Sequence, residues 1–283
     1  MPWSYQFDWS AYYRTPEGLA EKYLDRLNLT RRQPSRAFLD RLIEAHQRII
    51  PFENLDAVLW NRPVSLEPEK MMEKILRQCR GGYCFELNGL FCMLLRELGF
   101  DAWLCLCRQL RHTEPCPVPA THCCILVNLD GQTLFCDVGY GGPMPRGSIE
   151  WKTDVLQEVR GERYSFRRSG MTARGAEDGV LSCGWYDLIW HPSGGGKQAV
   201  PLIQAAPAPM YVSDFYGANL LRSTGDTRYG VLHVFRCTEN GYVDLTGEKL
   251  TVQSGETRME SIVRPEELPR ILQECFQIRG SLS

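Results

Sequence analysis

The sequence predicts an α+β protein with a helical first domain (residues 1–99), a β-rich second domain (100–204) and a smaller α/β third domain (205–283). Apolar residues recur at helical spacing through the first hundred residues, whereas alternation with a period of two begins at about Phe100. A hairpin pattern and a final helical pattern follow the Ala/Pro-rich segment 205–209, which we interpret as a linker.

The helices of the first domain are expected over residues 15–27, 34–49, 67–78 and 84–98. Thr15-Pro16-Glu17 combines an N-cap residue, a proline suited to the first helical position and an acidic first turn, so we start the first helix there. The last helix is the clearest, because apolar side chains at spacings of three and four follow Cys84 and Gly99 supplies a C-terminal stop. Gly81-Gly82 interrupts the helical pattern just before this last helix.

Strands are expected over residues 102–108, 122–128 and 133–138, with shorter candidates up to Trp190. The second and third are joined by Asp130-Gly131, and an Asp-Gly pair between apolar runs is a strong hairpin signal. Asn240-Gly241 marks another hairpin in the third domain, and a final helix is expected near residues 268–276.

Composition excludes several classes of protein. The chain has 283 residues, of which 43% are apolar and 23% charged, with a formal net charge of -2. These values are those of a globular protein and provide no general electrostatic attraction to nucleic acid or an anionic membrane. The longest apolar runs, such as residues 90–95, are far too short to span a bilayer, and the N-terminus has no secretory signal pattern. We therefore expect a cytoplasmic protein without nucleic-acid or membrane partners.

The 12 cysteines do not indicate a disulfide framework or a zinc site. No C-x-x-C motif occurs, and no Cys/His doublets have zinc-finger spacing, so no metal is expected. Most of these cysteines lie in apolar patterns, where a free thiol behaves as a small hydrophobic side chain.

Cys84 is the candidate nucleophile. It follows Gly81-Gly82 at the expected start of a helix, where the first N–H groups and the helix dipole favour the negative charge of a thiolate. Adjacent glycines also allow a substrate to approach the backbone closely. The alternative is an inert cysteine buried at a helix start.

His122 is the candidate base among the five histidines, which are His46, His112, His122, His191 and His233. If Asp130-Gly131 forms a two-residue turn, paired positions along the hairpin place Gly139 opposite His122 and Asp137 opposite Cys124. Asp137 is then a diagonal neighbour on the same face as His122, where a carboxylate can orient an imidazole ring and stabilise its cation. The alternative is an Asp–His pair that only holds the hairpin together.

Three segments of the sequence resemble the arylamine N-acetyltransferase family. RGGYCFELN at residues 80–88 resembles its R-G-G-x-C-x-E-x-N segment, PFENL at 51–55 its P-F-E-N-L segment, and DVGYG at 137–141 its D-x-G-F-G segment. The intervals from Cys84 to His122 and from His122 to Asp137 also fit that family. The resemblance covers most of the chain and implies an N-terminal helical bundle, a central antiparallel β-barrel, a C-terminal α/β lid and a transglutaminase-like Cys-His-Asp core.

The resemblance also implies an activity. Cys84, assisted by His122 and Asp137, would take an acetyl group from acetyl-CoA and pass it to an arylamine, hydrazine or N-hydroxyarylamine. Acetyl-CoA would be the acyl donor and co-substrate, and the protein would be a monomer or a weak homo-oligomer. By the same resemblance Phe52 and Tyr140 line the acceptor pocket. CoA would be bound by Thr121, Gly139, Gly141, Ser223 and Thr224. Supporting roles fall to Arg80 and Glu53, as an ion pair beneath the nucleophile, and to Asn88.

Departures from the family pattern leave alternatives open. The segment after Ser223-Thr224 lacks the usual Pro and Ser, and Arg228 in it is either a ligand for a phosphate or an acyl carboxylate, or a solvated loop charge. A related acyltransferase or amide synthase that uses malonyl or larger acyl thioesters is therefore the second hypothesis. A cysteine hydrolase, for which the papain-type signature is absent, and a non-catalytic binding module are the others.

Overall fold

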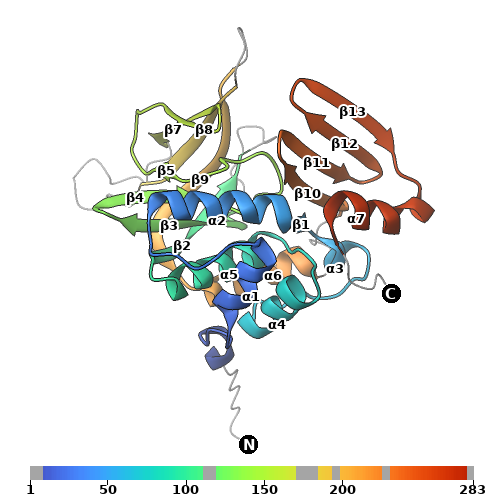
Figure 1. Ribbon diagram of the computed structural model, residues 1–283, viewed down its shortest axis with the longest axis horizontal. Helices are drawn as coiled ribbons and strands as arrows, with labels where there is room; N and C mark the ends of the chain where they lie inside the picture. The colour runs from blue at the N-terminus through green and yellow to red at the C-terminus, as the bar shows by residue number, and fades with distance from the viewer. Residues whose placement is uncertain (1–8, 111–118, 170–183, 193–197, 225–229, 279–283) are drawn as a thin grey trace, which may run out of the picture.

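The helices of the first domain lie on one side of the molecule, with an eight-stranded and a five-stranded sheet side by side above them (Figure 1). The computed structural model describes residues 9–110, 119–169, 184–192, 198–224 and 230–278. The predicted α+β class is confirmed. The helical segments are η1 (Trp9–Tyr12), α1 (Leu19–Leu27), α2 (Arg36–Ile49), α3 (Leu55–Val58), α4 (Pro68–Met72), η2 (Glu73–Arg77), α5 (Cys84–Glu97), η4 (Val212–Phe215), α6 (Tyr216–Ser223), η6 (Pro265–Glu267) and α7 (Leu268–Phe276).

The predicted helices are present, with two differences. One concerns where a helix begins, and the other concerns the type of helix. The first begins at Leu19 and not at residue 15, because Gly18 has a φ of 70°, a left-handed conformation that an α-helix cannot include. The third is an α-helix only as far as Met72, and its last five residues, Glu73–Arg77, form a π-helical turn. The helix that starts at Cys84 runs to Glu97, and Gly99 ends it with a φ of 94°.

The central part of the chain forms an eight-stranded antiparallel sheet whose two outermost strands, β5 and β6, contact each other, so that it closes almost into the implied barrel. The strands are β2 (Asp101–Gln109), β3 (His122–Leu129), β4 (Gln132–Cys136), β5 (Ile149–Glu150), β6 (Gln157–Val159), β7 (Glu162–Arg168), β8 (Tyr186–His191) and β9 (Val200–Met210). Their spatial order is β5-β4-β3-β2-β9-β8-β7-β6.

The Asp130-Gly131 hairpin forms in the predicted register but ends early. Pairing runs from Leu129 and Gln132 to Ile125 and Cys136 and goes no further, so the expected pairing of Asp137 with Cys124 and of Gly139 with His122 is wrong. The chain turns at that point because the Asp137 carboxylate accepts a hydrogen bond from the Gly139 N–H at 2.8 Å, a local turn that ends the strand.

The interpretation of residues 205–209 as a linker is also wrong, because they belong to β9. Pairing with β8 ends at Ala205, beyond which β9 pairs only with β2. Among the described residues the remainder of β9 thus has no second partner strand, and proline is tolerated at such an edge because it has no N–H to leave unpaired. The division of the chain after residues 99 and 204 stays a prediction.

The lid is a five-stranded sheet in the order β1-β10-β11-β12-β13, covered on one face by α7. Its strands are β1 (Phe52–Glu53), β10 (His233–Thr238), β11 (Gly241–Thr246), β12 (Lys249–Ser254) and β13 (Thr257–Ile262). The short strand β1 comes from the first domain and ties the PFENL segment to the lid, since Phe52 pairs with Phe235. The predicted hairpin at Asn240-Gly241 and the predicted final helix are confirmed.

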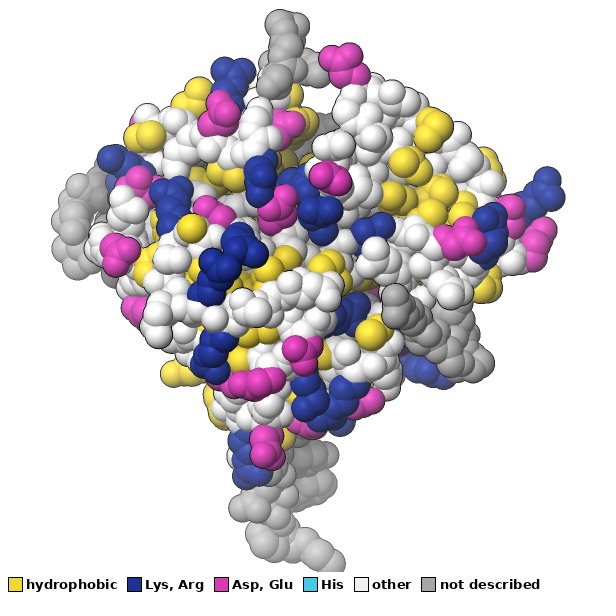
Figure 2. Space-filling model, viewed as in Figure 1, with side chains coloured by type: hydrophobic (Ala, Val, Ile, Leu, Met, Phe, Trp, Pro, Cys, Tyr) yellow, Lys and Arg dark blue, Asp and Glu magenta, His cyan; other side chains and the backbone are white. Residues whose placement is uncertain are grey.

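Charges of both signs are interspersed over the face seen in Figure 2, as expected from the net charge of -2. No helix among the described residues is long and apolar enough to cross a membrane.

Candidate active site

Cys84 is the first residue of α5, and two glycines determine how the chain reaches it. The Gly81 backbone lies so close to Pro51 that a Cβ there would be 2.0 Å from the Pro51 carbonyl oxygen. Gly82 then bridges to the same PFENL segment, since its carbonyl accepts from the Glu53 N–H at 2.8 Å. The Cys84 side chain is 2% exposed, and its thiol donates to the Thr121 carbonyl oxygen at 3.7 Å.

His122 and Asp137 meet beside this thiol in a fully buried ion pair. The His122 Nε2 atom is 2.5 Å from Asp137 Oδ2, and both side chains are 0% exposed. The other ring nitrogen, Nδ1, has no nitrogen or oxygen partner among the described residues, and the Cys84 sulfur lies within interaction range of the ring. The structure thus brings the three predicted side chains together, although the hairpin ladder ends before it reaches them.

The pKa of His122 reflects this position. Burial disfavours the charged ring, but the Asp137 carboxylate outweighs it through its charge and its hydrogen bond, and Cys84 adds to the effect, so the pKa is raised to about 10. At neutral pH the ring is therefore an imidazolium. A cation held against a sulfur atom favours the thiolate form of a cysteine.

Asn88, on the next turn of α5, holds the Asp137 loop in place. Its amide nitrogen donates to Asp137 Oδ1 and to the Cys123 carbonyl, both at 2.8 Å, and its carbonyl accepts from the Val138 N–H at 2.9 Å. Gly139 then passes so close to the nucleophile that a Cβ there would lie 2.8 Å from Cys84 Cα. The supporting role implied for Asn88 stays a prediction, and these three bonds are consistent with it.

The ion pair expected beneath the nucleophile is confirmed. Arg80 places one guanidinium nitrogen 2.7 Å from Glu53 Oε1 and another 2.9 Å from Asp56 Oδ1. Glu53 is 0% exposed, and its second oxygen accepts from the Leu55 N–H at 2.8 Å.

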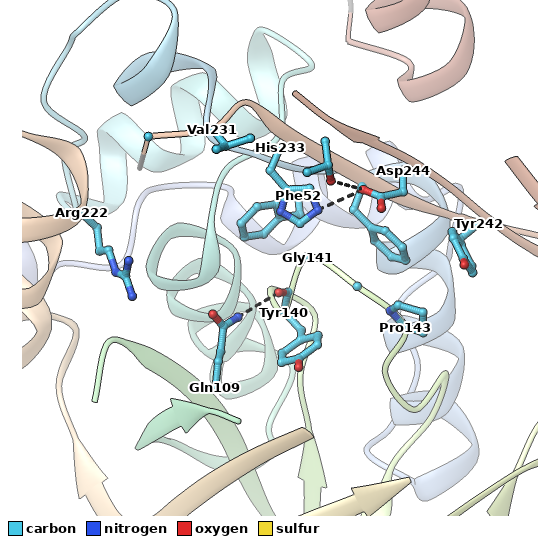
Figure 3. Close-up of a pocket in the computed structure, with 14 residues that line it drawn as sticks. Phe52, Gln109, Tyr140, Gly141, Pro143, Arg222, Val231, His233, Tyr242 and Asp244 are labelled. Carbon is cyan, nitrogen blue, oxygen red and sulfur yellow. Dashed lines mark hydrogen bonds and ion pairs between the residues drawn. The ribbon is translucent and has the colours of Figure 1, made fainter. Parts of the chain in front are cut away.

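A cavity of about 500 Å³ opens between the barrel, the lid and α6. Figure 3 shows Phe52, Tyr140 and Gly141 on its walls, so the two residues implied for the acceptor pocket do line a cavity. The Tyr140 hydroxyl, however, donates to the Leu202 carbonyl at 3.2 Å, so the polar tip that distinguishes it from Phe is turned to the barrel backbone.

Cys84 is not among the residues that line this cavity, but hydrogen bonds through Thr121 link it to the wall. Arg222 of α6 lines the cavity and donates to the Thr121 hydroxyl at 2.7 Å, and the carbonyl of the same threonine accepts from the Cys84 thiol. Thr121 therefore connects the Arg222 side chain in the cavity wall with the Cys84 sulfur.

The residues implied for CoA fall into two groups. Thr121, Gly139 and Gly141 lie around the nucleophile and the cavity. The hydroxyls of Ser223 and Thr224 instead donate to carbonyls of α6, at Asn219 and Leu220, each at 2.8 Å. CoA binding by all five stays a prediction, and Arg228 lies outside the described residues. Among the described residues no group of three or more His, Cys, Asp and Glu side chains could hold a metal ion.

Some polar residues in the cavity walls could not be predicted from sequence patterns. His233 is in a strand with an apolar pattern, yet its ring faces the cavity, 3.1 Å from Asp244 Oδ1 and 5.1 Å from the centre of the Phe52 ring. The register of β10 and β11, which puts Phe235 opposite Asp244, sets this arrangement and is visible only in the folded sheet.

The fold and this site define a protein of the transglutaminase-like class, in which a cysteine at a helix start meets a His–Asp pair carried by a β-barrel. The family model described as N-acetyltransferase matches residues 37–281. The chain belongs to the arylamine N-acetyltransferase family.

Individual relatives agree with this assignment. The chain is 40% identical over 129 residues to the arylamine N-acetyltransferase / N-hydroxyarylamine O-acetyltransferase of Salmonella typhimurium, a match that covers 45% of each chain. It is 37% identical over 154 residues to the arylamine N-acetyltransferase of Mycolicibacterium smegmatis, covering 52% of this chain and 56% of that one. The matches thus span about half the length of these curated relatives. The structure of the Mycobacterium abscessus arylamine N-acetyltransferase is similar over 93% of this chain and 90% of that one, with a TM-score of 0.80 and 26% identity.

We predict that Gly139→Ala impairs the site, whereas Gly217→Ala does not. The new methyl group would contact Cys84 Cα and the Asn88 amide, and backbone atoms cannot move aside cheaply. We expect a loss of about 1–3 kcal/mol in the free energy of unfolding, measured in urea, and slower alkylation of Cys84 by iodoacetamide. Gly217 is exposed in α6 with nothing within 4 Å of the new methyl, so its variant is the control. Equal behaviour of the two variants would contradict the tight contact.

The raised pKa of His122 predicts how stability depends on pH. A ring that is protonated up to about pH 10 in the folded protein, but only to about 6.5 when unfolded, contributes stability that is complete below about pH 6.5. That contribution is lost as the pH rises towards about 10, by at most about 1.4 kcal/mol per pH unit. Urea unfolding of wild type and His122→Gln between pH 6 and 10 measures it. A difference between the two proteins that stays constant over this range would refute the ion pair.

Proposed function

We propose that the protein is an acyltransferase that moves an acetyl group from acetyl-CoA to an arylamine, hydrazine or N-hydroxyarylamine by way of an acetyl-cysteine at Cys84. The observation that carries the proposal is the contact of a thiol with an imidazolium whose other nitrogen is fixed by a buried carboxylate. The names of the relatives support the same chemistry. Sulfur is suited to the carrier role, because exchange of one thioester for another is nearly balanced in free energy.

The first half-reaction loads the enzyme. The Cys84 thiolate attacks the carbonyl carbon of acetyl-CoA, and a new C–S bond forms while the bond to the CoA sulfur breaks. The His122 imidazolium gives its proton to the departing CoA thiolate and becomes neutral. At the first position of α5, the Cys84 N–H is suitably placed to stabilise the oxyanion that forms in between.

The second half-reaction transfers the acetyl group. The amine attacks the acetyl-cysteine, neutral His122 takes the proton that the amine loses, and Cys84 leaves again as a thiolate. Asp137 keeps Nε2 of the ring occupied, which leaves Nδ1 to give and take the proton in both halves. Phe52 and the apolar part of Tyr140 offer an aromatic acceptor two ring faces in the cavity.

Mixing with acetyl-CoA in the absence of an acceptor should add one acetyl group to the protein, and an arylamine should then remove it. Intact mass and peptide mapping measure this. Burial raises the pKa of many other thiols, so these should stay protonated and unlabelled: Cys92, Cys107, Cys123, Cys124, Cys136 and Cys237. Cys84→Ala should abolish the adduct and Cys275→Ser should retain it. An adduct on another cysteine, or none, would overturn the proposal.

One observation favours the second hypothesis, a donor whose acyl group carries a carboxylate, such as malonyl-CoA. The Arg222 guanidinium lies in the cavity wall next to Thr121 and hence close to the Cys84 sulfur. A carboxylate one carbon beyond an acyl group on that sulfur could pair with this cation.

Kinetics with acetyl-CoA and malonyl-CoA decide between the donors. If Arg222 binds the acyl carboxylate, Arg222→Leu should lower kcat/KM for malonyl-CoA by about ten- to hundredfold, because a hydrogen bond to a charged group is lost. The same variant should change kcat/KM for acetyl-CoA only slightly, and Arg222→Lys should keep most of the malonyl activity. An equal loss with both donors would eliminate the malonyl hypothesis.

A further inference from the structure

Beneath the start of α5 lies a cluster of five charged side chains from separate segments of the chain, and most of it was not foreseen from the sequence. These side chains come from β1, α3, η2, the turn before α5 and α5 itself. Figure 1 shows β1, α3 and α4, which η2 continues, on the side of the helical layer below the lid. The cluster consists of Glu53, Asp56, Lys74, Arg80 and Glu86.

Lys74 is the centre of this cluster. Its ammonium nitrogen is 2.6 Å from Asp56 Oδ2, 2.8 Å from Glu86 Oε1 and 3.8 Å from Glu53 Oε1. The Lys74 side chain is 13% exposed, whereas Glu53 and Glu86 are 0% and 1% exposed. Three carboxylates therefore face two cations, Lys74 and Arg80, in a largely buried position. The Lys74 ammonium is the group that contacts all three carboxylates.

Lys74 lies within a local irregularity of the helix. The chain widens into a π-helical turn over Glu73–Arg77, and the Gln78 N–H bonds to the Glu73 carbonyl five residues earlier at 2.9 Å. Such turns occur often at functional sites. The Lys74 carbonyl in turn accepts from the Arg80 N–H at 3.2 Å, so the π-turn also anchors the RGG segment.

Glu86 connects the cluster to the nucleophile. One of its carboxylate oxygens is held by Lys74, and the other accepts the N–H of Tyr83, the residue before Cys84, at 3.0 Å. The carboxylate also fills the space beside Gly82, where a Cβ would lie 2.8 Å from Glu86 Oε2. The position of the peptide that leads into Cys84 is thus set by a carboxylate whose own charge depends on Lys74.

We propose that Lys74 and Glu86 are a positioning pair for the nucleophile. Lys74 compensates the negative charge of the buried carboxylates, and the Glu86 side chain that it holds fixes the backbone N–H of Tyr83, the residue before Cys84. This inference rests on the proposed function in taking Cys84 as the nucleophile. Neither side chain touches the substrate or the reacting atoms, and both act through the backbone at the start of α5.

The pair also makes the site sensitive to pH. Burial raises the pKa of Glu86 to about 7, with Lys74 lowering it and the charges of Asp56 and Glu53 raising it. Arg80 faces the same cluster through Glu53 and Asp56. The Glu86 carboxyl consequently gains or loses its proton near neutral pH while it holds the N–H of Tyr83, the residue before Cys84.

The test is the pH profile of Cys84 alkylation by iodoacetamide in five proteins: wild type, Lys74→Met, Lys74→Arg, Glu86→Gln and Lys70→Met. Lys70 is the matched control, because it lies on α4 one turn before Lys74 and its side chain is 62% exposed. The Glu86 carboxyl is followed independently by NMR titration of ¹³C-labelled glutamate, with its signal assigned by comparison with Glu86→Gln.

Wild type and Lys70→Met should both show an inflection near pH 7 in the rate profile and in the carboxyl titration. Glu86→Gln should lack it. Loss of the ammonium favours the protonated carboxyl, so Lys74→Met should move the inflection up by about one pH unit or more. Lys74→Arg, which keeps the charge, should restore it close to the wild-type position.

A merely structural role would lower the rate or the stability without moving the inflection. If Lys74→Met titrates like wild type, or if Glu86→Gln keeps the inflection in the rate profile, the inference is overturned. If Lys74→Met does not fold, Glu86→Gln and Lys74→Arg still decide it. Failure of the proposed function is distinct, since wild type would then form no acetyl adduct while the NMR titration would still report on Lys74 and Glu86.

Discussion

The ion pair between His122 and Asp137 is the interaction on which the site depends, because it keeps a charged ring in a place from which water is excluded. Burial alone would drive the ring to its neutral form, and the carboxylate at 2.5 Å reverses that effect. The pair in turn needs Asn88, which fixes the Asp137 carboxylate from the nucleophile's own helix. Helix and barrel are thus joined at the point where the sulfur and the imidazole meet.

The start of α5 has charge clusters on both sides, and they act on different atoms. On the barrel side, the imidazolium acts on the sulfur itself. On the helix side, Lys74, Arg80 and three carboxylates act on the backbone that presents the sulfur. The two glycines before Cys84 allow the chain to pass between PFENL and Glu86, and a Cβ at either position would meet an atom at 2.9 Å or less.

Local patterns predicted the elements well, because periodicity and turn residues report on short-range structure. The α5 stripe and the Asp130-Gly131 turn both formed as expected. The ladder could not be extended to Asp137, since a local turn ends the strand there and Asn88, which is 49 residues away, also holds the Asp137 carboxylate. His233, Lys74 and Arg222 were missed for a similar reason. A strand register, a π-turn and a helix position bring them to the site, and none of these leaves a motif in the sequence.

The central claim is that the ring beside the Cys84 sulfur is charged at neutral pH. The most direct measurement is the ¹⁵N chemical shift of the His122 ring nitrogens at pH 8, assigned by comparison with His122→Gln. Two protonated nitrogens are expected in wild type, because the Asp137 carboxylate holds the proton on Nε2 and helps to raise the pKa of the ring to about 10. A neutral ring at pH 8, with one nitrogen unprotonated, would contradict the account.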